Sequence, residues 1–182
     1  MLDQDEAPQL SSQPWDIANE ITIVRSWNRW LTRLLGRAPR IVVAEDEAPI
    51  LESIVSWFNY AGFEVHGVSD GSELCTILEP LLCADQRGWG PDILLSDLRM
   101  PGIDALGVVE GLRYAGHRLP IVVVSACTDP LIWARVTRLQ DTVFVAKPFD
   151  VMKLHEIACQ AIVRVRSNPD SPPFPAPLPL VL

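Results

Sequence analysis

The sequence predicts an α/β protein in which helices cover both faces of a parallel β-sheet. Residues 40–166 alternate short β-branched apolar runs with amphipathic helical stretches, a pattern typical of successive βα units. The runs read as continuous Val, Ile and Leu, which indicates strands buried on both faces, as in parallel sheets. Five such units in about 125 residues predict one doubly wound domain.

The expected elements follow one another in strict alternation. We expect the strands at 40–44, 63–67, 92–96, 121–125 and 142–146. We expect the helices near 48–61, 71–84, 104–115, 130–139 and 150–166. Every predicted strand is therefore followed by a helix, so its carboxyl end opens into a strand-to-helix connection.

An additional helix is predicted before the sheet, over residues 14–37. Pro14 suits the first turn of a helix, and apolar residues recur at helical spacing along residues 17–35. Gly36 and Pro39 are stop signals at its end. The domain is therefore expected to carry an N-terminal helical extension.

The two ends of the chain have compositions that disfavour regular structure. Residues 1–13 are polar and acidic, and we expect them to be disordered. Residues 167–182 are rich in proline, which lacks the backbone donor of helices and central strands, so we expect a disordered tail. The acidic start does not resemble a secretory signal, and no apolar run reaches the roughly 20 residues of a membrane span. These features predict a cytoplasmic protein.

Charge and cysteine usage exclude several classes of protein. The formal net charge of −8 argues against a nucleic-acid binder, which would present a basic surface. The 4 cysteines form no Cys-x-x-Cys pair, and only Cys159 has a histidine near it in sequence, His155, unlike a zinc site or a disulfide framework. We expect them to be small apolar residues in a reducing compartment.

Polar residues stand at the carboxyl ends of four predicted strands. Glu45 and Asp46 follow the first strand, Asp97 follows the third, Ser125 ends the fourth and Lys147 follows the fifth. In open parallel sheets, functional groups gather in the crevice at this edge. The sequence therefore predicts that these side chains lie close together.

The combination of residue types indicates phosphoryl chemistry. Carboxylates that converge would repel one another without a cation, and Mg²⁺ prefers a few carboxylates plus waters. The lysine is suited to a phosphoryl oxygen and the serine hydroxyl can donate to another. The set therefore describes a site that stabilises a phosphoryl group on a carboxylate.

Each residue also has an ordinary explanation. Glu45 and Asp46 could stabilise the start of the next helix, and Asp97 could be a turn residue before a Pro-Gly pair. Ser125 could be a strand-end hydroxyl and Lys147 a solvated surface charge. None of these explanations accounts for all of them falling at one edge.

Four motifs in a fixed order resemble a known family. They are Val-Val-Ala-Glu-Asp-Glu, Asp-Ile-Leu-Leu-Ser-Asp-Leu-Arg-Met-Pro-Gly-Ile-Asp, Ile-Val-Val-Val-Ser-Ala and Val-Ala-Lys-Pro-Phe-Asp. With them, residues 40–166 resemble a response-regulator receiver domain of the chemotaxis-regulator type, a module of two-component signalling. The resemblance implies a flavodoxin-like sheet with the strand order 2-1-3-4-5.

The resemblance also implies a role for each acidic residue. Asp97 would accept a phosphoryl group from a histidine kinase or a histidine phosphotransfer protein. Glu45, Asp46 and Asp97 would hold Mg²⁺ together with the backbone carbonyl of Arg99.

The remaining implied roles belong to residues of the last two strands and the loops after them. Lys147 would pair with the phosphoryl group and Ser125 would hydrogen-bond to it. Phe144 would be the aromatic switch that turns inward. The Lys147–Pro148 peptide bond would be cis.

The sequence departs from the family pattern at several places. Glu45 and Ser125 stand where aspartate and threonine are frequent, and both replacements keep the chemistry. Phe144 replaces a frequent tyrosine and loses its hydroxyl. The stretch 84–91 looks long, the helix at 130–139 looks short, and a frequent glycine before the last strand is absent. These departures bear on the surface through which the receiver would contact a downstream target, and not on the phosphorylation site.

The expected function is a signalling module, not an enzyme. No helix-turn-helix motif follows the receiver, so we expect a stand-alone module that acts through contacts with a downstream protein target. A haloacid-dehalogenase-type phosphatase would need an acid two residues after Asp97, where this chain has Arg99. A degenerate receiver is a second alternative, which the intact set of site residues disfavours.

The N-terminal helix leaves two alternatives open. Arg25, Arg29 and Arg33 recur every fourth residue and form a basic stripe, with Trp27 and Trp30 elsewhere around the helix. The favoured alternative is a helix docked on its own receiver or on a second copy, which would be a homodimer. The other is contact with an anionic membrane surface, to which basic stripes beside tryptophan are suited.

Overall fold

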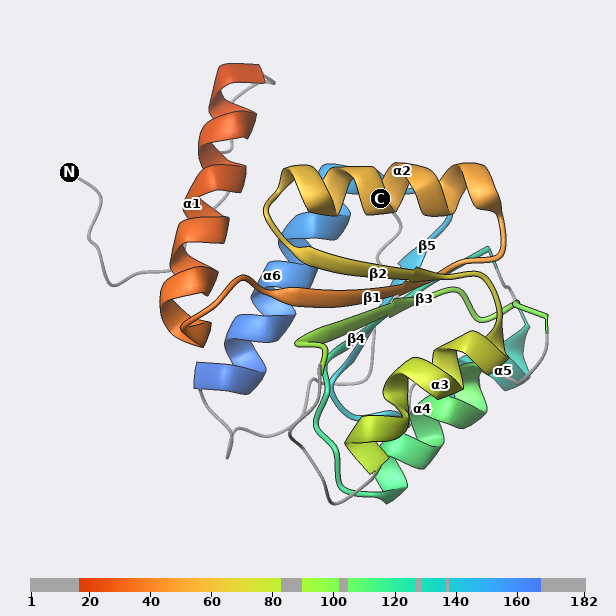
Figure 1. The fold of residues 1–182 in the computed structure, drawn as a ribbon. Helices are drawn as coiled ribbons and strands as arrows, with labels where there is room; N and C mark the ends of the chain where they lie inside the picture. Colours follow the sequence, from red (N-terminus) through yellow and green to blue (C-terminus); the bar gives the residue numbers. More distant parts are fainter. Residues whose placement is uncertain (1–16, 83–89, 102–104, 127–128, 137, 168–182) are drawn as a thin grey trace.

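A five-stranded parallel sheet forms the centre of the molecule (Figure 1). The computed structural model describes residues 17–82, 90–101, 105–126, 129–136 and 138–167. The strands are β1 (Arg40–Ala44), β2 (Glu64–Val68), β3 (Ile93–Ser96), β4 (Ile121–Ser125) and β5 (Thr142–Ala146). Their spatial order is β2-β1-β3-β4-β5, and every pair is parallel. The predicted fold class and strand order are confirmed.

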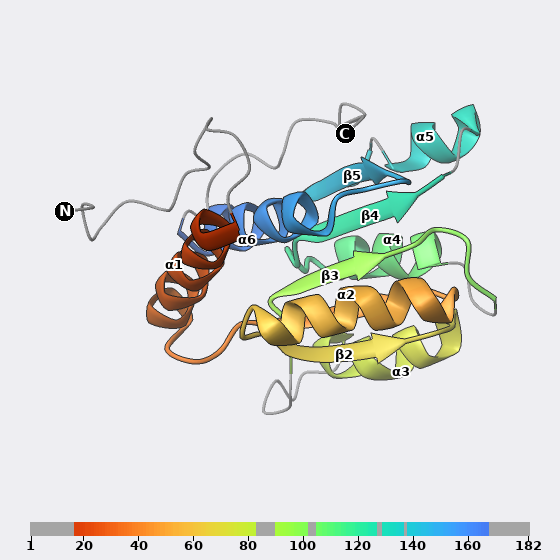
Figure 2. The same ribbon diagram turned by 90° about the horizontal axis from the view of Figure 1, so that it is seen from above.

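Helices cover both faces of the sheet (Figures 1 and 2). They are α1 (Ile17–Leu35), α2 (Ala48–Tyr60), α3 (Gly71–Leu82), α4 (Ala105–Tyr114), α5 (Pro130–Val136) and α6 (Val151–Ser167). One face packs against α2 and α6, and the other against α3 and α4, which gives two apolar cores on opposite sides of the sheet. Among the described residues, no helix combines the length and apolar composition that a membrane crossing requires.

The central strands and the edge strand differ in burial. All residues of β3 and β4 are buried, as expected for strands covered on both faces. In β2, by contrast, Glu64, His66 and Gly67 are exposed. The expectation of burial on both faces is therefore wrong for β2. The other edge strand, β5, has no exposed residue, so an edge position alone does not account for the exposure of β2.

Most predicted boundaries agree with the structure to within two residues. The bounds of β1, β4 and β5 are those predicted, whereas β2 and β3 each begin one residue later. The helix predicted at 130–139 already ends at Val136, and α6 continues to Ser167, one residue into the predicted tail. The predictions for residues 1–13, the rest of the tail and most of the stretch 84–91 fall outside the described residues.

The helix α1 docks on the receiver of its own chain. Val24, Trp27 and Leu31 are buried on one face and belong to the same apolar core as residues of α2 and α6. The basic stripe is exposed on the opposite face. Trp27 is only 1% exposed, so its indole is not available to a membrane surface. The alternative that placed α1 on its own receiver is confirmed.

Ion pairs to one buried aspartate connect α6 and the segment after α1 to the sheet. Asp92, which directly precedes β3, is 0% exposed. Arg37 donates to both of its oxygens, at 2.6 and 3.0 Å, and Arg166 from the last turn of α6 donates at 2.8 Å. The backbone N–H of Arg40 adds a fourth bond at 2.9 Å. We call Asp92, Arg37 and Arg166 the Asp92 clasp, and it joins the connection between α1 and β1 and the last turn of α6 to the start of β3.

Candidate functional site

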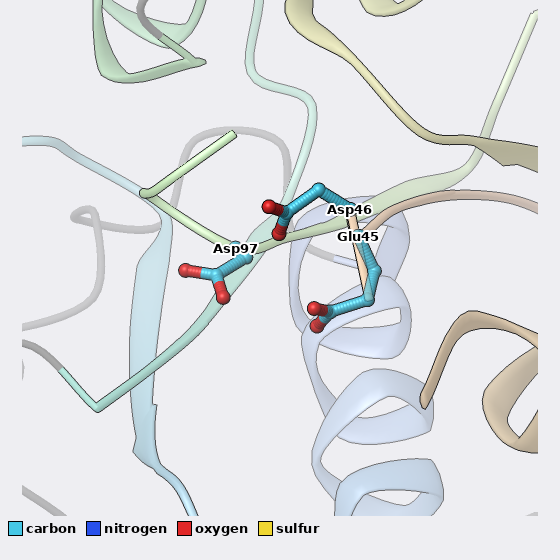
Figure 3. Close-up of side chains that lie close together, drawn as sticks. All are labelled: Glu45, Asp46 and Asp97. Carbon is cyan, nitrogen blue, oxygen red and sulfur yellow. The ribbon is translucent and has the colours of Figure 1, made fainter. Parts of the chain in front are cut away.

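The carboxyl ends of the parallel strands bring the predicted site residues together. Glu45 follows β1 and Asp97 follows β3, and the sheet pattern continues past both strand ends. The backbone N–H of Asp97 donates to Ala44 O at 2.8 Å, and that of Lys147 donates to Ser125 O at 3.1 Å. These bonds fix the backbone on which the polar side chains stand. Figure 3 shows Glu45, Asp46 and Asp97 gathered at this edge.

Lys147 lies between the acidic side chains. Its Nζ is 2.6 Å from Asp97 Oδ2 and 2.9 Å from Glu45 Oε1. A longer contact of 3.7 Å joins it to Glu47 Oε1. The lysine side chain is 12% exposed, so one largely buried ammonium group serves several carboxylates.

Burial and ion pairing act in opposite directions on the two central groups. Burial raises the pKa of Glu45 above its ordinary value, and the hydrogen bond from Lys147 offsets only part of that effect. Burial lowers the pKa of Lys147, but hydrogen bonds to Asp97 and Glu45 outweigh it, and the net shift is upward. The lysine is therefore held in its charged form, as a phosphoryl-binding group must be.

Three acidic residues offer a donor set for a metal ion. Oxygen atoms of Glu45, Asp46 and Asp97 all lie within 4.8 Å of one another. Glu45 Oε2 is buried and accepts no hydrogen bond within the described structure, although it lies 2.8 Å from Lys147 Nζ. One lysine does not neutralise three carboxylates, and hard divalent cations prefer such oxygen ligands. The residues present therefore fit Mg²⁺. The prediction that these three carboxylates lie close together is confirmed.

The other predicted site residues stand around this centre. Ser125 is the last residue of β4 and is 2% exposed, and Phe144 in β5 is also 2% exposed and packs into an apolar core. The backbone N–H of Arg99 donates to Asp97 Oδ1 at 3.0 Å. The Lys147–Pro148 bond is cis, as the resemblance implied. The functional roles of these residues stay predictions.

Sequence reasoning passed over Glu47. Its carboxylate reaches Lys147, yet the sequence analysis assigned it no role of its own. The signal was available in the run Glu45-Asp46-Glu47, because three consecutive acids at one strand end exceed what a helix start needs.

Comparison with known proteins decides the family. Residues 41–158 match the family model described as the response regulator receiver domain. The chain belongs to the response-regulator receiver family. Receiver domains are the signalling modules of two-component systems, in which an aspartate accepts a phosphoryl group, and they typically bind Mg²⁺ in an acidic pocket.

The curated relatives are longer than this receiver. The DNA-binding response regulator MtrA of Mycobacterium tuberculosis strain H37Rv is 29% identical over 133 residues, which cover 73% of this chain and 53% of MtrA. A probable transcriptional regulatory protein of Picosynechococcus sp. is 31% identical over 143 residues, covering 74% of this chain and 55% of the relative. The chain thus spans about half the length of these relatives.

Solved structures show the same fold. The receiver domain of the Francisella response regulator 1452 matches with a TM-score of 0.59 at 21% identity, covering 70% of this chain and 98% of that one. The receiver domain of the hybrid histidine kinase CckA matches with a TM-score of 0.53 at 26% identity, covering 68% and 98%. Helix α1 precedes the residues that the family model matches, and the last turns of α6 follow them.

Proposed function

We propose that Asp97 accepts a phosphoryl group from a histidine kinase or a histidine phosphotransfer protein, and that the phosphorylated receiver then binds a protein target. The observation that supports this most strongly is the 2.6 Å contact between Lys147 Nζ and Asp97 Oδ2 beside two further carboxylates. A charged lysine at this distance can pair with an oxygen of the phosphoryl group as the group is transferred to Asp97. Family membership supports the reaction class, and the position of Asp97 beside Lys147 supports the choice of this aspartate.

In the proposed reaction, a carboxylate oxygen of Asp97 attacks the phosphorus atom of a phosphohistidine. An oxygen–phosphorus bond forms while the nitrogen–phosphorus bond breaks, and its electron pair returns to the donor imidazole. Lys147 pairs with a phosphoryl oxygen and offsets the added negative charge. Glu45, Asp46, Asp97 and the carbonyl of Arg99 would hold Mg²⁺, which would stabilise the negative charge of the phosphoryl group.

Two buried residues connect phosphorylation to the surface in this proposal. Ser125 donates its hydroxyl hydrogen to a phosphoryl oxygen, because the group adds about −1.5 to −2 charge and three acceptors. Movement of the β4 end gives Phe144, in the neighbouring strand, a different packing environment. The result is a shift between two surface conformations rather than a new fold.

Labelling with acetyl phosphate tests the proposal. The chain is incubated with acetyl phosphate and Mg²⁺, and its intact mass is measured. We expect one phosphoryl increment that disappears in Asp97→Asn and when Mg²⁺ is chelated. Glu52→Gln is the control, since it removes an exposed acid of α2 outside the site and keeps the increment. An increment that survives in Asp97→Asn, or a wild-type chain that is never labelled, would overturn the assignment.

A further inference from the structure

Glu47 occupies a helix start without acting as a side-chain cap. It is the N-cap residue of α2, and its carbonyl accepts the N–H groups of Ile50 and Leu51, both at 2.9 Å. Its carboxylate makes no capping hydrogen bond. Glutamate is not a preferred N-cap residue, whereas Ser, Thr, Asp and Asn are. The helix dipole favours an acid at this position, but it does not account for where the Glu47 carboxylate lies.

The Glu47 carboxylate instead faces the ammonium group of the site. Its Oε1 lies 3.7 Å from Lys147 Nζ, and the side chain is 63% exposed. The other two acidic partners of Lys147, Glu45 and Asp97, are buried. Glu47 is not one of the three acids whose oxygens form the candidate metal cluster. It therefore contacts the lysine from the solvent side, at the entrance of the site.

We infer that Glu47 is a positioning residue that holds Lys147 from the solvent side and sets the electrostatic potential at the entrance. This inference rests on the proposed function of Asp97. An added negative charge at the entrance attracts a divalent cation and repels a small anionic phosphoryl donor. It also gives Lys147 an alternative partner, with which an incoming phosphoryl group must compete.

The expected effects have opposite signs for the two ligands. In Glu47→Gln, Mg²⁺ binds more weakly, while labelling by acetyl phosphate at saturating Mg²⁺ becomes faster. Each change is about two- to five-fold at low ionic strength, the range for one exposed charge beside an ion pair. Both changes shrink towards zero near 1 M salt, because the Debye length falls to about 3 Å.

The experiment compares wild type, Glu47→Gln and Glu52→Gln. Glu52 is an exposed acid of α2 that forms no ion pair with Lys147 within the described structure, so its variant controls for loss of one charge on the same helix. Mg²⁺ affinity is measured by calorimetry, the labelling rate by intact mass, and the free energy of unfolding by urea titration. We expect Glu52→Gln to match wild type and Glu47→Gln to show the two opposite changes with unaltered stability.

Several results would overturn the inference. They are unchanged affinity and rate in Glu47→Gln, changes of the same sign, changes that persist in high salt, or equal changes in Glu52→Gln. Failure of the proposed function is distinguishable from these. A wild-type chain that acetyl phosphate does not label contradicts the role of Asp97, while the Mg²⁺ titration still tests the charge effect of Glu47.

Discussion

The two ends of β3 each carry an aspartate, and the two are held in different ways. Asp92, before the strand, is 0% exposed and accepts two hydrogen bonds on each oxygen, from Arg37, Arg166 and the backbone of Arg40. Asp97, after the strand, accepts one on each oxygen within the described residues, from Arg99 N–H and Lys147. Asp97 also shares its lysine with Glu45.

This contrast shows how one residue type serves two purposes in one strand. An ionised carboxylate has about four acceptor positions, and at Asp92 all of them are used. The Asp92 carboxylate is therefore stabilised by its hydrogen bonds and has little acceptor capacity left for a metal ion or an electrophile. Asp97 keeps open acceptor positions beside other acids, an arrangement that favours a cation or an electrophile. Under the proposed function of Asp97, the number of satisfied acceptor positions distinguishes the structural aspartate from the one that reacts.

Exchanging each aspartate for asparagine breaks the contrast most directly. We expect Asp92→Asn to lower the free energy of unfolding by about 2–4 kcal/mol, since two arginines lose a buried counterion. Asp97→Asn should change it by no more than about 1 kcal/mol, because loss of the Lys147 pair is offset by weaker repulsion among the acids. Urea titration of both variants without Mg²⁺ measures the difference. Equal losses would mean that Asp97 is as structural as Asp92.

The pH dependence of stability extends the comparison to His155 in α6, a titratable group whose pKa is shifted by burial alone. Burial lowers the pKa of His155 from 6.5 to about 4. The unfolded chain therefore takes up a proton before the folded one does. The stabilisation is complete above about pH 6.5 and is lost as the pH falls towards 4. We expect a loss of about 2–3 kcal/mol between roughly pH 7.5 and 4.5.

His155→Phe isolates this contribution. The ring of His155 packs against those of Phe58 and Phe63, so phenylalanine keeps an aromatic ring in the same place. Urea titrations across the pH range should show a smaller decline for the variant than for wild type. A parallel decline in both proteins would show that His155 is not the group that titrates.

A smaller effect tests the docking of α1. Gly62 and Gly36 both have positive φ, at 87° and 69°, so alanine is strained at either position. A Cβ on Gly62 would overlap the Asn28 amide of α1, whereas one on Gly36 would meet nothing within 4 Å. We expect Gly36→Ala to cost about 1 kcal/mol and Gly62→Ala about 0.5–1 kcal/mol more. Thermal unfolding of both variants measures this.

Asn28→Ala provides the control for the contact. Combined with Gly62→Ala, it should recover the additional loss, because the overlapping amide is gone. If the double variant is no more stable than Gly62→Ala alone, the extra cost does not come from the α1 contact.

The sequence predicted the fold well where local and global signals agree. The strands β1, β4 and β5 consist mostly of β-branched and apolar residues, and their bounds were predicted without error. Predictions were poorer where tertiary contacts set an end. Asp92 was assigned to a strand, but its side chain serves Arg37 and Arg166, which are 55 and 74 residues away. No local pattern contains that information.

The candidate site was predictable for the same reason as the sheet. In a parallel sheet every strand ends at one edge, so Glu45, Asp97 and Lys147 could be placed together from their positions after strands. What could not be predicted is how the single lysine is shared. That depends on side-chain reach and burial, which set Glu45 inside the site and Glu47 at its entrance.

The Asp92 clasp also defines how much chain is needed for folding. The residues that match the family model run from 41 to 158, while Arg37 and Arg166 both lie outside them. A fragment trimmed to the matched residues would keep the Asp92 carboxylate and lose both of its guanidinium partners. The part of the chain that stabilises the fold is therefore longer than the part that matches the family model. Truncation at residues 41 and 158 removes both ion pairs of a buried aspartate.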